Sequence, residues 1–120
     1  MQRDPRKYLY DVSVAAERVQ RFLGGKSLDD YQQDDLLRAG VERQFEIMGE
    51  ALNPRSRVAP NIADEVPEYR RIVGFRNILI HGYADVDDQL VWGVASGKLP
   101  ELYRAVTALL ERLENDESFE

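Results

Sequence analysis

The residues best suited to chemistry lie in one short stretch, from Gly74 to Trp92. It contains the chain's only histidine, His81, with Arg76 five residues before it and Tyr83 two residues after it. Histidine can take up or release a proton at neutral pH. Arginine is a permanent, fork-shaped cation that matches the oxygens of a phosphate. These residue types suit cleavage of RNA by its own 2′-hydroxyl, which needs a base, an acid and a cation.

The spacing of these two residues gives little support to a site within one chain. Five residues on an α-helix turn through about 500°, so the side chains of Arg76 and His81 point about 140° apart. One histidine also supplies only one of the two proton-transfer groups. A two-fold dimer would bring two copies of both residues to one cleft. The alternative is a structural histidine that favours the negative end of a helix dipole.

Tyr83 and a set of charged residues on an earlier helix also have both a functional and a purely structural interpretation. Tyr83 can accept a phosphoryl or nucleotidyl group or stack on a base, or it can simply cover the end of a helix. Arg43, Glu46 and Glu50 share a helix face at spacings of three and four residues. They form either an exposed ion pair of little energetic value or a support for the arginine or histidine of the site.

Composition bounds the class of protein. The 120 residues are enough for about one domain, and 43% of them are hydrophobic. The chain has no cysteine and a single histidine, which excludes a disulfide, a thiolate metal site and a multi-histidine zinc site within one chain. RNA cleavage by the 2′-hydroxyl needs no metal, and we expect no cofactor. The N-terminus lacks a signal-peptide core, and no apolar run approaches the roughly 20 residues that span a bilayer. We therefore expect a soluble, cytoplasmic protein.

Charge is unevenly distributed. The net charge of −6 argues against a protein that coats nucleic acid, because phosphate contacts need clustered basic residues. Residues 53–81 nevertheless carry five arginines and three acidic residues, a local net charge of +2. This distribution favours a small, selective phosphate site on an acidic body.

Apolar periodicity predicts an all-α fold, an up-and-down bundle of about five helices in one domain spanning residues 1–120. Helices are expected at residues 5–23, 35–52, 67–81, 87–97 and 99–113, with a short helical turn around Tyr31 that follows a cap at Ser27. Residues 54–67 contain three prolines and should form an irregular connection. Residues 114–120 should be a frayed acidic tail. The stripes expected to face the core include Leu36, Ile80 and Leu90.

The segment from Arg76 to Tyr83 resembles the RNxxxHxY signature of HepT-like toxins, in the HEPN ribonuclease superfamily. Residues 3–9 are similar to the start of that family, and residues 42–51 resemble its second-helix pattern, which ends in IGEA. Residues 87–92 and 99–102 resemble its closing segment. The chain departs from the family at Tyr69, where many relatives have tryptophan, and at Gln44-Phe45, where Asn-Leu is common. These departures bear on core packing and leave the motif intact.

The resemblance implies a HEPN bundle that dimerises around the motif and cleaves RNA without a metal ion. It implies catalytic roles for Arg76 and His81, with Asn77 as a motif position. It also implies a partner, an MNT-type nucleotidyltransferase antitoxin that neutralises the toxin by transferring AMP to Tyr83. The alternative is a non-catalytic helical module that only binds such a nucleotidyltransferase. The overall charge of −6 favours this alternative.

Overall fold

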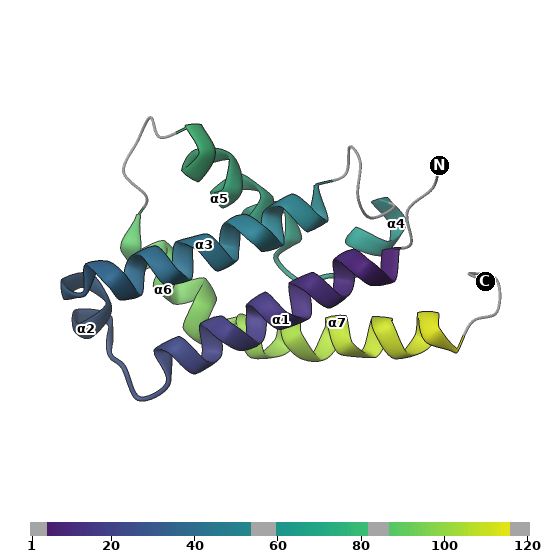
Figure 1. Ribbon diagram of the computed structural model, residues 1–120, viewed down its shortest axis with the longest axis horizontal. Coiled ribbons are helices and arrows are strands. Elements are labelled where there is room, and N and C mark those ends of the chain that lie inside the picture. The colour runs from purple at the N-terminus through teal and green to yellow at the C-terminus, as the bar shows by residue number, and fades with distance from the viewer. Residues whose placement is uncertain (1–4, 54–59, 82–86, 116–120) are drawn as a thin grey trace.

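A computed structural model describes residues 5–53, 60–81 and 87–115 (Figure 1). All regular secondary structure in these segments is helical, which confirms the predicted all-α fold. The helices are α1 (Pro5–Leu23), α2 (Leu28–Gln33), α3 (Asp35–Leu52), α4 (Pro60–Ala63), α5 (Tyr69–His81), α6 (Asp88–Gly97) and α7 (Leu99–Glu114). Within the described residues, no helix combines the length and apolar character that crossing a membrane requires.

Four long helices form the body of the bundle. Helix α3 packs against both α1 and α5, and α1 also packs against α7. Figure 1 shows α3 between α5 and α1, with successive long helices α1, α3 and α5 running in alternating directions. Helix α6 packs at one end, against α1, α2 and α7. The arrangement places α5, which carries the candidate residues, on the outer side of α3.

Local capping sets several of these helix boundaries. Ser27 and Asp30 form a capping box, in which the Ser27 hydroxyl accepts from Asp30 N at 3.1 Å and the Asp30 carboxylate accepts from Ser27 N at 2.9 Å. The hydrogen bond from the Ser27 backbone lowers the pKa of Asp30. Asp34 caps α3 by accepting from Leu37 N at 3.0 Å. The cap at Ser27 was predicted from the sequence, whereas the start of α3 was predicted without its capping residue.

The core is made by one apolar stripe from each long helix. Phe45 of α3 and Phe75 of α5 meet edge to face, with ring centroids 5.6 Å apart, and this contact fixes α5 on α3. Other fully buried side chains come from all four long helices of the body and from α2: Leu9, Val12, Val19, Tyr31, Met48, Leu52, Ile72, Leu102 and Val106. The burial of these stripes is as the apolar periodicity predicts.

Three residues expected in the core are exposed instead. Leu36 is 82% exposed because it lies in the first turn of α3, before the buried stripe of that helix begins at Val41. Leu90 is exposed because Val91, about 100° further round α6, is the residue that faces the core. Ile80 is exposed because it lies in the last turn of α5, beyond the buried Phe75.

The connection between α3 and α5 is more ordered than predicted. It contains the short helix α4, and Ile62, Ala63 and Val66 are buried. The prediction that α5 begins at Pro67 was wrong by two residues, because Glu68 has a φ angle of 63° and interrupts the helical path. Residues 54–59 lie outside the described part of the chain, as does most of the predicted acidic tail, residues 116–120.

Candidate active site

Helices α3 and α5 approach each other closely at Gly49, which faces Arg76. A Cβ atom at position 49 would lie 2.3 Å from Arg76 Cβ and 3.0 Å from the backbone oxygen of Ile72. Only a residue without a side chain therefore fits this packing. The sequence contains one signal for this contact, a glycine inside an otherwise helical apolar pattern, but the contact partner depends on how the two helices pack.

Arg76 is held from two sides. Its Nη2 atom pairs with Glu50 Oε2 at 2.5 Å, and its Nη1 atom donates to Asn77 Oδ1 at 3.2 Å. The Arg76 side chain is only 21% exposed, so its orientation is fixed by packing as well as by these polar contacts. The structure thus brings together three residues that the sequence singled out, Arg76, Asn77 and Glu50.

The predicted pair between Arg43 and Glu46 is present, with 2.7 Å between Arg43 Nη1 and Glu46 Oε1. It is an exposed pair one turn before Glu50 on α3. Of the three residues Arg43, Glu46 and Glu50, Glu50 forms the ion pair with Arg76, and Arg43 lines the same groove.

A groove of about 420 Å³ lies between α1, α3 and α5. We call it the Arg76 groove. Its carboxylates outnumber its guanidinium groups, so Arg76 lies in a mixed rather than a purely basic environment. Among the described residues of α5, Arg76 and Ile80 line the groove and His81 does not. This agrees with the angular separation expected on a helix. The remaining lining residues are Tyr8, Asp11, Arg43, Glu46, Ile47, Glu50 and Ala51.

His81 is the last residue of α5, and its side chain is exposed. Tyr83 follows two residues later and lies outside the described residues. The next described helix is α6, whose N-cap Asp87 accepts hydrogen bonds from Gln89 N at 3.0 Å and Leu90 N at 3.2 Å.

Comparison with known proteins places this sequence in a family. The family model described as Ribonuclease HepT-like matches residues 12–109. "Putative RNase TTE0752" of Caldanaerobacter subterraneus subsp. tengcongensis is 30% identical over 90% of this chain and 96% of its own length. "Putative RNase MJ1380" of Methanocaldococcus jannaschii is 31% identical over 87% of this chain and 94% of its own length.

A third relative is "Probable ribonuclease HepT" of Thermococcus cleftensis, which is 29% identical over 85% of this chain and 92% of its own length. No solved structure matches the chain. The family model covers most of the sequence, including both Arg76 and His81. Because the match extends over nearly the whole helical bundle, the chain belongs to the HepT-like ribonuclease family.

Proposed function

We propose that this protein is a metal-independent endoribonuclease, in which Arg76 and His81 cleave RNA at a cleft between two copies of the chain. The observation that supports it most is the clamped guanidinium of Arg76, held by Glu50 and Asn77 on the helix that ends at the exposed His81. Membership of the HepT-like ribonuclease family supports the same reaction class.

Arg76 supplies the cation. A guanidinium group has five N–H donors, and the contacts to Glu50 and Asn77 engage only part of that set. These contacts fix the plane of the guanidinium before RNA arrives, so little reorganisation is needed when charge develops on phosphorus. The remaining donors bind the non-bridging phosphate oxygens. Glu50 and Asn77 are positioning residues in this scheme.

His81 supplies the proton transfers. The imidazole of one copy accepts the proton of the RNA 2′-hydroxyl, whose oxygen then forms a bond to the adjacent phosphorus. The bond from phosphorus to the 5′-oxygen breaks, and that oxygen takes a proton from the imidazolium of the other copy. The products carry a 2′,3′-cyclic phosphate and a 5′-hydroxyl. No step uses a metal ion.

Exposed apolar side chains on α5 support the proposed dimer. Ile78 and Ile80 lie on either side of the stripe that carries His81 and are 42% and 47% exposed. A second copy packed on α5 would cover these side chains and bring the paired histidines together. We expect Ile78→Asp to keep the monomer folded, shift the protein from dimer to monomer in sedimentation, and reduce cleavage. If Ile78→Asp becomes monomeric and cleaves as fast as the parent protein, the shared cleft is wrong.

Single-turnover cleavage of labelled RNA in EDTA tests the catalytic residues. We expect Arg76→Ala and His81→Ala each to lose about 10²-fold or more in rate, as is usual for removal of one catalytic group. Arg104→Ala, which removes an exposed arginine on α7, is the charge-matched control and should cleave normally. Full activity in both site variants would refute the assignment. A parent protein that never cleaves RNA but binds a nucleotidyltransferase would support the non-catalytic module instead.

We further propose that the protein is a cytoplasmic toxin neutralised at Tyr83. In this reaction the Tyr83 hydroxyl attacks the α-phosphorus of ATP on an MNT-type nucleotidyltransferase, forms a phosphodiester to AMP and releases pyrophosphate. The added anion, two residues from His81, would repel the RNA phosphate. After co-expression with the nucleotidyltransferase, mass spectrometry should find one adenylate on the Tyr83 peptide. Relief of toxicity with that peptide unmodified would contradict the proposal.

A further inference from the structure

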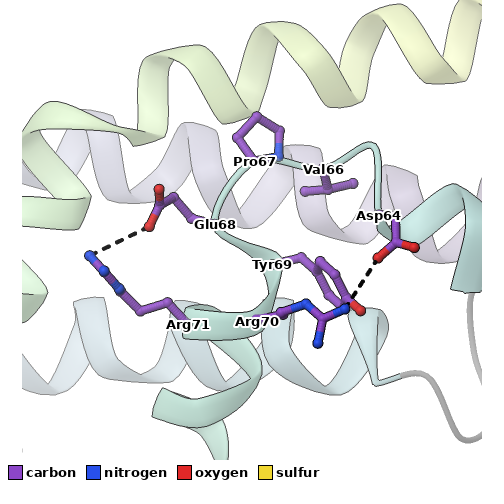
Figure 2. Close-up of a pocket in the computed structure, with 7 residues that line it drawn as sticks. All are labelled: Asp64, Val66, Pro67, Glu68, Tyr69, Arg70 and Arg71. Carbon is purple, nitrogen blue, oxygen red and sulfur yellow. Dashed lines mark ion pairs between the residues drawn. The ribbon is translucent and has the colours of Figure 1, made fainter.

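A second hollow lies at the other end of α5, away from the Arg76 groove. This pocket, about 610 Å³ in volume, is formed by the connection from α4 and the first turn of α5 (Figure 2). Among the described residues, it shares no lining residue with the Arg76 groove. The proposed cleavage reaction does not use it. Its lining residues are Asp64, Val66, Pro67, Glu68, Tyr69, Arg70 and Arg71.

The backbone at the entrance of α5 is strained. Glu68 has a φ angle of 63°, in the left-handed region that residues other than glycine seldom occupy. Such strain often occurs at binding sites, where surrounding contacts maintain it. Here the Glu68 carbonyl accepts from Ile72 N at 3.0 Å, and its carboxylate pairs with Arg71 at 3.5 Å. This turn sets the direction in which α5 begins and hence the position of Arg70.

Arg70 is presented to solvent in a defined orientation. Its guanidinium carbon lies 5.4 Å from the centroid of the Tyr69 ring, which is itself packed against the core. Figure 2 shows both side chains at the pocket, with a dashed line from Arg70 to the nearby Asp64. The Arg70–Asp64 distance is 3.9 Å, and the two side chains are 82% and 57% exposed. Such a pair contributes little, so a phosphate can replace the carboxylate. A guanidinium over an aromatic ring keeps its edge donors free for that phosphate.

Arg70 lies on the same stripe of α5 as His81. Arg70, Gly74, Asn77 and His81 follow one another at spacings of four, three and four residues, which keeps them within one face of a helix. The stripe from Arg70 to His81 is about 16.5 Å long. Gly74 lies within it, and a Cβ atom there would meet nothing within 4 Å. Within one chain this face is opposite the buried Ile72 and Phe75. In the proposed dimer the second copy packs at its His81 end, on Ile78 and Ile80, so the RNA would leave that cleft along the stripe towards Arg70.

We propose that Arg70, held against Tyr69, binds a phosphate of single-stranded RNA a few nucleotides from the bond that is cleaved. The RNA strand follows the stripe from His81 past Gly74 to the pocket of Figure 2. The inference rests on the proposed ribonuclease function. It adds a contact to a second RNA phosphate, away from the phosphate at which the strand is cleaved. Arg70 contributes affinity for longer RNA and takes no part in the chemical step.

Binding is measured first, in the His81→Ala background so that the RNA remains intact. Fluorescence anisotropy with a labelled single-stranded RNA compares Arg70→Ala with Arg104→Ala at 0.1 M and 1 M salt. One phosphate contact on a single strand contributes a salt slope of about 0.7, so its loss should weaken binding about fivefold at 0.1 M and hardly at all at 1 M. Arg104→Ala should leave the dissociation constant unchanged. Equal weakening by both variants would overturn the proposal.

Cleavage of short and long substrates gives a second measurement. A dinucleotide cannot bridge the stripe, so Arg70→Ala should cleave it at the parent rate while cleaving a longer RNA more slowly at limiting concentration. An equal loss on both substrates would overturn the outlying site. If the parent cleaves RNA and Arg70→Ala binds it normally, this inference alone fails. If RNA binding depends on Arg70 but the parent never cleaves, only the ribonuclease proposal fails.

Discussion

The close approach at Gly49 makes Gly49→Ala a direct test of how α3 positions Arg76. The new methyl group would lie 2.3 Å from Arg76 Cβ. Neither atom can move by changing a rotamer, because each Cβ is bonded directly to its own backbone. The two helices must instead move apart, or Arg76 must shift relative to Glu50, its ion-pair partner on α3.

The size of this movement can be estimated. Carbon atoms in contact lie about 3.5 Å apart, so the two Cβ atoms must separate by roughly 1.2 Å from their 2.3 Å distance. Overpacking of this kind destabilises a protein by about 1–3 kcal/mol. The better helix propensity of alanine offsets about 1 kcal/mol of this loss. Stability should therefore fall by up to about 2 kcal/mol. A misplacement of about 1 Å at a catalytic group can reduce the rate by about 10²-fold.

Two measurements separate folding from positioning. Urea unfolding gives the change in stability, and single-turnover RNA cleavage in conditions where the variant is fully folded gives the change in rate. Gly93→Ala in α6 is the matched control, because a Cβ there would meet nothing within 4 Å. This control should be stabilised by up to about 1 kcal/mol and cleave normally. If Gly49→Ala is as stable and as active as Gly93→Ala, the tight packing of α3 on Arg76 is wrong.

Three further predictions concern the region around α2, α3 and α6. The hydroxyl of Tyr31 is buried with no hydrogen-bond partner among the described residues. Tyr31→Phe should therefore leave the free energy of unfolding in urea unchanged or raise it by about 1 kcal/mol. A large loss of stability would show that this hydroxyl does have a hydrogen-bond partner. Burial, followed by the nearby carboxylate of Asp88, raises the pKa of Glu42. Its protonated form therefore stabilises the fold at low pH, and that contribution is lost as pH rises through the raised pKa. Glu42→Gln should be more stable than the parent at pH 7, with the advantage shrinking as pH falls towards 4.5, and a constant difference across pH would contradict this. Asp87→Ala removes the cap of α6 and should lower the thermal midpoint at a cost of about 1 kcal/mol, whereas Asp87→Asn should retain most of the stability; equal loss in both would argue against capping.

Features determined by neighbouring residues in the chain were predictable from the sequence. The cap at Ser27 is an example, because donor and acceptor are three residues apart. The long helices were likewise predictable from their apolar periodicity. The exposure of Leu36 was not, because it depends on where along α3 the buried stripe begins. The left-handed conformation of Glu68 was not predictable either, since any non-glycine residue is an unfavourable choice there.

In the candidate site, too, the motif residues were predictable from the sequence and the contacts between helices were not. The motif resemblance singled out Arg76, Asn77 and His81, and the comparisons confirm the family that it indicated. The pairing of Glu50 with Arg76 and the role of Gly49 depend on how two helices pack that are distant in sequence. Residue types suggested a support for the arginine, but only the packed structure identifies which side chain provides it.

The end groups of the RNA fragments test the central claim most directly. Purified protein is incubated with a defined single-stranded RNA in EDTA, and the fragments are identified by mass spectrometry, with His81→Ala as the parallel sample. Cleavage by the 2′-hydroxyl with proton transfer by His81 predicts 2′,3′-cyclic phosphate and 5′-hydroxyl ends from the parent and no fragments from His81→Ala. Fragments ending in 3′-hydroxyl and 5′-phosphate, or equal cleavage by His81→Ala, would contradict the proposed mechanism.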